Sequence, residues 1–174
     1  ALLNAALHTA YAVSYNANGG EGAPAVQVKE KGKALKLSTV IPTRRHFTFL
    51  GWATTRTAKS AQYKAGASYT KDADVTLYAV WKPVLATKIT VTPATAALCG
   101  ANRTLELTAS VLPAEADDTV TWSSSNEKIA TVDENGVVTT HGVYGTVTIT
   151  AAAADGSRRT GKGTLTVKSP RTEA

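Results

Sequence analysis

The second half of the chain alternates apolar and polar residues with a period of two over several short segments. Alternation of this kind indicates β-strands with one buried face, and the half shows no helical period. Turn residues separate the segments, notably Pro93, Asn135-Gly136 and Asp155-Gly156. We predict strands around residues 88–92, 104–111, 120–122, 129–132, 137–139, 145–151 and 165–167. Seven short strands with regular turns are typical of a β-sandwich.

The first half is also rich in strand patterns, although they are less regular. Apolar or alternating segments occupy residues 11–15, 26–28, 47–52 and 75–81. The last of them is apolar on both faces, which predicts a central strand. Residues 54–70 are polar with little periodicity, and they predict either a short helix or an ordered loop.

The motifs of the second half resemble a known family. The strings Ile89-Thr90-Val91-Thr92-Pro93, Val120-Thr121-Trp122-Ser123-Ser124-Ser125-Asn126, Ile129-Ala130-Thr131-Val132-Asp133 and Gly145-Thr146-Val147-Thr148-Ile149-Thr150 are similar to the group 2 bacterial immunoglobulin-like domain. The resemblance covers residues 86–168 and implies a seven-stranded Ig-like sandwich. It departs from the family at residues 99–102 and 141–144, both in expected loops. Independently of any family, Trp122 is large enough to fill the centre of such a sandwich.

A second resemblance covers residues 11–83. It depends on the strings Tyr15-Asn16-Ala17-Asn18-Gly19-Gly20, Phe47-Thr48-Phe49-Leu50-Gly51-Trp52 and Thr76-Leu77-Tyr78-Ala79-Val80-Trp81. They look like the Listeria–Bacteroides repeat, the B-repeat type of internalin surface proteins. This resemblance implies a small β-grasp-like module in a bacterial surface or secreted protein, with Trp52 and Trp81 mainly in its core.

The expected organisation is therefore a mainly β chain of two modules. Residues 1–10 are interpreted as an upstream linker remnant and residues 169–174 as a C-terminal tail. The short junction at residues 82–86 contains Pro83, which predicts semi-rigid coupling of the modules. The start at Ala1 and the absence of methionine suggest a fragment of a longer protein. No stretch approaches the roughly 20 apolar residues of a membrane-spanning helix.

The charge of the chain is concentrated in its first half. Residues 1–84 carry eleven basic and four acidic residues, whereas residues 85–174 carry eight basic and nine acidic residues. Lys29, Lys31 and Lys33 recur at a period of two, so an extended strand would place them on one face. The candidate polyanion-binding set is Lys29, Lys31, Lys33, Lys36, Arg44 and Arg45.

Such a basic face could bind teichoic acid, sulfated glycans or anionic mucins, with an affinity that falls as salt rises. The alternative is a solubilising edge strand, on which lysines prevent unwanted strand pairing. We do not expect nucleic acid as a partner, because the aromatic residues fall in apolar strands and do not interleave with the basic ones.

The sequence contains no catalytic motif, and we predict neither a cofactor nor a metal site nor an enzymatic activity. His8, His46 and His141 are isolated, and the single Cys99 excludes an intrachain disulfide. We expect Cys99 to be a buried or half-buried thiol, because no histidine lies near it to activate a nucleophile. The acids of the turns, such as Asp72 and Asp74, suit solvated loops better than a calcium site.

Three functions follow from these observations. The first is a structural and adhesive spacer in an extracellular bacterial protein, with glycans, cell-wall polymers, host surface proteins and neighbouring modules as partners. The second is an accessory glycan-binding module of a large secreted enzyme, which needs an exposed aromatic platform. Tyr63, Tyr69 and Tyr144 are its candidate residues. The third, an intrinsic hydrolase, has no supporting motif.

Overall fold

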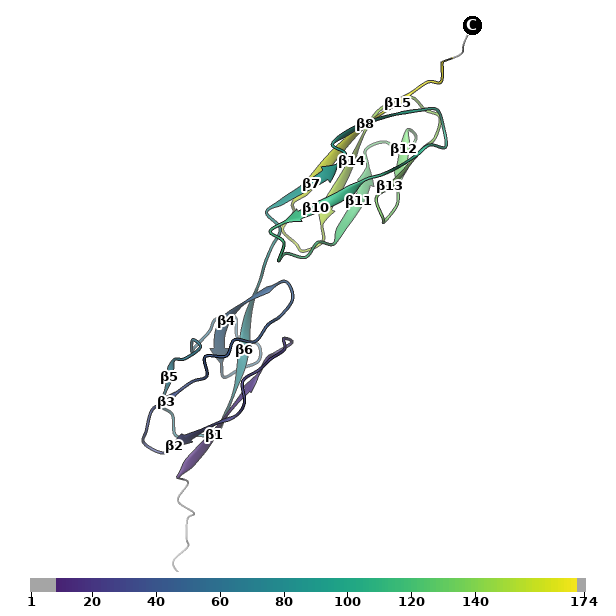
Figure 1. Cartoon of the computed structure of the whole chain (residues 1–174). Coiled ribbons are helices and arrows are strands. Elements are labelled where there is room, and N and C mark those ends of the chain that lie inside the picture. Colours follow the sequence, from purple (N-terminus) through teal and green to yellow (C-terminus); the bar gives the residue numbers. More distant parts are fainter. Residues whose placement is uncertain (1–8, 172–174) are drawn as a thin grey trace, which may run out of the picture. The chain divides into compact units, whose positions relative to one another are not determined.

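The computed structural model describes residues 9–171, and the chain divides into two compact units, residues 1–83 and 84–174 (Figure 1). Both units consist of β-strands and loops, which confirms the predicted mainly β fold class. Across residues 9–171 there is no helix long and apolar enough to cross a membrane. His8, most of the predicted linker remnant at residues 1–10 and the end of the tail at residues 169–174 lie outside the described residues.

The first unit is organised around a four-stranded sheet with the order β2-β1-β6-β4. Its strands are β1 (Ala10–Asn16), β2 (Gln27–Glu30), β4 (Phe47–Ala53) and β6 (Val75–Pro83). The first and last strands, β1 and β6, run parallel in the centre of the sheet, and the outer pairs are antiparallel. Parallel central strands of this kind agree with the predicted β-grasp-like module.

Strand β6 is central because its sequence is apolar on both faces. Leu77, Ala79 and Val80 are all buried, so neither face of the strand is open to solvent. The prediction of a central strand at residues 75–81 is therefore confirmed.

A small ribbon completes the core of this unit. Strands β3 (Leu35–Lys36) and β5 (Ser68–Tyr69) pair antiparallel, and Leu37 and Tyr69 are buried beside the fully buried Trp52. Of the two structures predicted for residues 54–70, the ordered loop is correct. The predicted core position of Trp52 is confirmed.

Gly51 brings this loop onto the sheet at a β-bulge in β4. The register of β4 against β6 shifts between Phe49 and Gly51, and Gly51 has a φ of 139°. A Cβ at this position would lie 2.4 Å from the carbonyl oxygen of Tyr63. The close approach lets the backbone N–H of Trp52 donate to that same oxygen at 2.7 Å. Only glycine combines this backbone conformation with this contact.

The second unit is a sandwich of two layers. One consists of two small sheets, β10 (Thr108–Leu112) with β7 (Lys88–Thr92), and β12 (Ala130–Val132) with β13 (Val137–Thr140) and β9 (Thr104–Glu106). The other has the order β11 (Val120–Ser124), β14 (Gly145–Ala153), β15 (Thr160–Lys168) and β8 (Thr95–Cys99). Buried residues from both layers form one core, and Trp122 packs against it while remaining partly exposed.

One of the seven predicted strands of the sandwich is divided, and one observed strand, β8, was not predicted. The predicted strand at residues 104–111 divides at Leu107 into β9 and β10. The first predicted strand, residues 88–92, continues after Pro93 as β8, which pairs parallel with β15. The pattern missed β8 because its inward residues, Ala96 and Leu98, are only half-buried at the edge of the layer.

One charged side chain lies inside the first unit. Lys29 on β2 is 1% exposed, and its ammonium forms an ion pair with Asp72 and donates to the Glu30 carbonyl at 3.1 Å. Asp72 also accepts the Gly32 N–H at 3.1 Å. The Lys29 hydrogen bond and then the Gly32 N–H hold the pKa of the Asp72 carboxyl below its usual value. The pair ties the edge strand β2 to the loop before β6.

Gly51→Ala should destabilise the first unit far more than Gly22→Ala. Both glycines have positive φ, but a Cβ at Gly22 meets nothing within 4 Å. We expect about 1 kcal/mol for Gly22→Ala from backbone strain alone. The clash at Gly51 should add on the order of 2 kcal/mol or more. Urea unfolding followed by tryptophan fluorescence measures both values, and equal losses would contradict the packing at the bulge.

The Lys29–Asp72 pair predicts an acid-sensitive first unit. Because the pKa of Asp72 is lowered on folding, the pair stabilises fully above the unfolded pKa of about 3.9. That contribution is lost as the pH falls through the lower folded pKa, because a protonated Asp72 no longer forms the ion pair with Lys29. Asp72→Asn should be less stable at neutral pH and lose less stability between about pH 5 and pH 2. Parallel pH dependences of the two proteins in urea unfolding would refute this prediction.

Candidate functional site

The structure separates the lysines of the predicted basic face. Strand β2 ends at Glu30, and Gly32, with a φ of 76°, turns the chain there. Lys31 and Lys33 therefore lie in the turn after the strand, while Lys29 is buried. The prediction that an extended strand presents all three on one face is wrong, since the strand stops before the second of them.

The remaining members of the predicted set lie in different places. Lys33 forms an exposed ion pair with Glu30, and Lys36 is exposed on β3. Only Arg44 and Arg45 lie together, in the segment before β4, where both border a hollow beside Gly19 and Phe47. Polyanion binding by the full set remains a prediction, but the geometry directs attention to this end of the unit.

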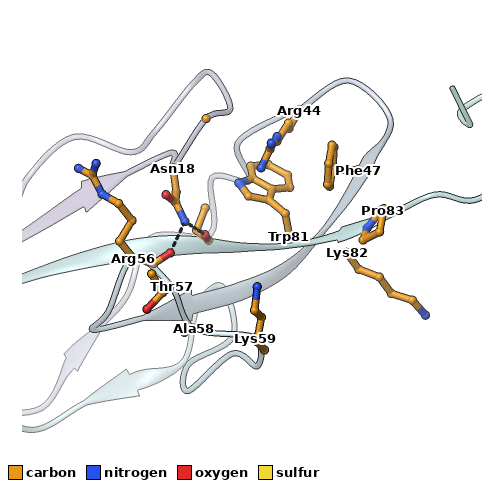
Figure 2. Close-up of a pocket in the computed structure, with 12 residues that line it drawn as sticks. Asn18, Arg44, Phe47, Arg56, Thr57, Ala58, Lys59, Trp81, Lys82 and Pro83 are labelled. Carbon is orange, nitrogen blue, oxygen red and sulfur yellow. Dashed lines mark hydrogen bonds between the residues drawn. The ribbon is translucent and has the colours of Figure 1, made fainter. Parts of the chain in front are cut away.

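Beside Arg44 lies an open pocket of about 730 Å³ (Figure 2). It is formed by the turn after β1, the segment before β4, the loop after β4 and the end of β6. Its lining residues are Asn18, Gly19, Arg44, Phe47, Arg56, Thr57, Ala58, Lys59, Ala79, Trp81, Lys82 and Pro83. The volume lies in the range of small-ligand pockets.

The Asn-Gly-Gly string forms one wall of the pocket. Asn18 and Gly19 both have positive φ, 50° and 87°, which is why asparagine and glycine are suited to this turn. The Gly20 N–H donates to the Ala17 carbonyl at 3.0 Å and closes the turn. The Trp81 indole N–H donates to that same carbonyl at 2.9 Å. A Cβ on Gly20 would lie 2.6 Å from the Trp81 ring, so turn and indole are in direct contact.

The Asn18 side chain connects the turn to the opposite wall. Its amide donates at 2.9 Å to the carbonyl of Arg56 and at 2.9 Å to that of Ala79. The first bond holds the loop after β4 and the second reaches β6, as Figure 2 shows. Hydrogen bonds within the protein therefore connect the walls of the pocket.

The pocket is strongly basic. Its lining contains four cations, Arg44, Arg56, Lys59 and Lys82, and no carboxylate. The two ion pairs found within residues 9–171 involve other residues, Lys29–Asp72 and Lys33–Glu30. The acidic side chain of Glu21 lies outside this lining, in the smaller hollow that Arg44 and Arg45 also border.

Aromatic rings support both arginines. The Arg44 guanidinium lies over the Phe47 ring at 3.9 Å from its centroid, and Arg56 lies 5.5 Å from that of Tyr78. Cation–π contact orients a guanidinium while its N–H groups remain able to bind an anion. Trp81, predicted to belong mainly to the core, contacts Phe49 edge-on at 5.6 Å but is partly exposed in the pocket.

The predicted tyrosine platform is not formed. Tyr69 is 2% exposed and packs edge-on against Tyr63, with centroids 5.4 Å apart. Tyr144 is exposed but belongs to the second unit. The prediction failed because strand β5 turns Tyr69 into the core.

Other chemical candidates of the sequence have structural roles or none. Within residues 9–171, no group of three His, Cys, Asp or Glu side chains could hold a metal ion. Asp74 accepts the Ala12 N–H at 2.8 Å, and Asp133 accepts the N–H groups of Asn135 and Val137 at 2.9 Å. Cys99 is exposed because it points outward from the edge strand β8, so the prediction of a buried or half-buried thiol was wrong.

Sequence reasoning missed Arg56, Lys59 and Lys82 as members of a site. They belong to two segments that the sequence keeps well apart from Arg44. The available signal was the Asn-Gly-Gly turn together with Trp81, since the contact between them brings these segments to one place.

Comparison with known proteins identifies both units. Residues 11–80 match the model of the Listeria-Bacteroides repeat domain, and residues 85–167 match that of the group 2 bacterial Ig-like domain. Both domain types are typical of bacterial surface proteins and are typically non-catalytic modules.

Curated relatives share only short segments with the chain. A 3-O-alpha-D-galactosyl-alpha-L-arabinofuranosidase of Bifidobacterium longum subsp. longum is 56% identical over 66 residues, covering 37% of this chain and 6% of that protein. A lacto-N-biosidase of Bifidobacterium bifidum is 47% identical over 53 residues, covering 30% and 5%. The chain thus spans less than a tenth of either relative.

Among solved structures, a C-terminal 282-residue fragment of intimin, in complex with the intimin-binding domain of its translocated receptor, is similar at 17% identity. The match covers 89% of this chain and 61% of that one, with a TM-score of 0.38. The intimin match extends over both units, whereas each of the two family models matches one unit. Each unit thus has a family match of its own, the Listeria-Bacteroides repeat domain for residues 11–80 and the group 2 bacterial Ig-like domain for residues 85–167.

Proposed function

We propose that the chain is a non-catalytic spacer and accessory-module pair within a larger extracellular bacterial protein. The observation that carries the proposal is the parallel pairing of an early strand with the last strand in each unit, β1 with β6 and β8 with β15. Because parallel strands point the same way, the chain enters at one end of a unit and leaves at the other. Each unit then adds its length to a tether.

The same pairing suits a tether that carries load. Tension applied at both ends pulls the two parallel strands of a unit in opposite directions along their axes. All the hydrogen bonds of the ladder then resist together, whereas in a hairpin opened at its ends they break one after another. The ladder β8–β15 pairs Thr95–Cys99 with Thr164–Lys168 and is extended by the bond from Gly100 N–H to the Lys168 carbonyl at 2.9 Å.

A second candidate is an accessory module of a glycan-active enzyme. Two glycosidases with 56% and 47% identity to parts of this chain favour it, since they contain related segments within far longer proteins. The predicted tyrosine platform does not support it, because Tyr69 is buried. The two candidates assume different parent proteins, but the modules can have the same role in both.

Force spectroscopy on the whole chain, held by handles at its termini, tests the tether. We expect two discrete unfolding events, each releasing roughly 200–250 Å of chain. In the parallel ladder the N–H of Ala96 points toward β15, as the flanking bonds from Thr164 and Gly100 require, while that of Ala97 points away. Ala96→Pro should shorten the lifetime of the second unit at constant force roughly tenfold, through one lost bond and one unpaired carbonyl.

Ala97→Pro is the matched control, since the same substitution one residue away removes an N–H that the ladder does not use. Its lifetime under force should stay near that of the unchanged chain. Equal effects of the two substitutions, or gradual extension of both units without discrete events, would overturn the load-bearing tether.

A further inference from the structure

The basic pocket beside Trp81 has a chemistry that a spacer does not need. We propose that it is a binding site for acidic saccharides, in which the cations hold a sugar carboxylate and the aromatic residues contact the sugar ring. The proposal depends on an extracellular location for the chain but not on its serving as a tether.

The positive charge of the pocket favours a negatively charged ligand. Four cations line it without a carboxylate among them, and neither ion pair of the described residues involves these cations. An unpaired set of this kind attracts negative charge and gains charge-assisted hydrogen bonds when an anion enters.

The arginines favour a planar anionic group. Arg44 lies over Phe47, so its guanidinium is oriented by the ring and its N–H groups can form a two-pronged contact with a carboxylate. Arg56, whose own carbonyl accepts the bond from Asn18, is fixed at its backbone on the opposite wall. The exposed Lys59 and Lys82 add positive charge at the rim.

The apolar surface distinguishes a sugar from a simple polyanion. Phe47, Trp81 and Pro83 line the same pocket as the cations, which suits a ring with C–H groups beside its acid group. A phosphate polymer offers nothing to this surface. A nucleic-acid base needs the full face of an aromatic ring, whereas Trp81 contacts Gly20, packs edge-on against Phe49 and is only partly exposed.

The pocket is also preorganised. The bonds from Asn18 to two carbonyls and from the Trp81 indole to Ala17 connect three of its segments through the protein's own groups. Binding therefore needs little ordering of the backbone, which improves the affinity of a small site.

The test is titration of the ¹⁵N-labelled whole chain with three probes. An oligogalacturonate has both sugar rings and negative charges, its methyl ester has the sugar rings without the charges, and inorganic polyphosphate has negative charges without sugar rings. The Trp81 indole N–H, which bonds to the pocket wall, reports binding. Trp52 and Trp122 do not line the pocket, so their indole signals are controls within the same molecule. We expect the oligogalacturonate to shift the Trp81 signal and leave the other two in place.

Two charge-reversal variants with the same change in net charge distinguish binding by the cations of the pocket from long-range attraction by the net charge of the unit. Arg56→Glu/Lys59→Glu should weaken binding at least about tenfold, since it removes charge-assisted contacts. Lys31→Glu/Lys36→Glu, outside the pocket, should weaken it less than about twofold at physiological salt. All four side chains are exposed, so both variants should fold.

Several results would overturn the proposal. They are an unmoved Trp81 signal with the oligogalacturonate, an equal shift with polyphosphate or with the methyl ester, and equal losses in the two variants. None of them bears on the tether, whose test is mechanical, so the two proposals can fail independently.

Discussion

Both units depend on a parallel pair between an early strand and the last one. In the first unit β1 and β6 form this pair at the centre of the sheet, and in the second β8 and β15 form it at the edge of a layer. Parallel strands cannot be joined by a short turn, so almost the whole unit must fold between them. The chain has no disulfide to hold its ends together, and this ladder and the core beneath it take that role.

The pocket of the first unit is a consequence of the same pairing. Because β1 and β6 are parallel, their carboxyl ends meet at one edge of the sheet, with Asn16 opposite Tyr78. The turn that follows β1 therefore lies against the end of β6, where the Trp81 indole bonds to Ala17 and Asn18 bonds to Ala79. The register of β1 against β6 is thus enough to bring a glycine-rich turn, an indole and the flanking cations to one place.

The strands could be predicted from the sequence because their burial alternates, but the site could not. The period of two located β1, β4, β6 and most of the sandwich. It failed at β8, whose inward residues are half-buried, and at Lys29 to Lys33, where Gly32 ends the extended conformation. The pocket gathers four cations from three separated segments, and no local pattern encodes that arrangement. Cys99 and Tyr69 were misplaced for a related reason, since the side of an edge or two-residue strand that faces the core is set by its partners.

The fold determines which charged side chains of the sequence are paired and which are able to bind a ligand. The first unit has a large excess of basic residues, but these residues differ in burial and in pairing. Lys29 is buried in an ion pair that holds an edge strand, Lys33 is paired with its neighbour Glu30, and the cations around Trp81 have no acidic partner in the pocket. Burying the Lys29 ammonium costs desolvation, and its ion pair with the exposed Asp72 leaves it little charge to attract a ligand, whereas cations without an ion pair beside apolar rings attract an anion more strongly. Net charge therefore directed attention to the half of the chain that contains the basic pocket, and the pairing of individual cations distinguishes Lys29 and Lys33 from the cations that line it.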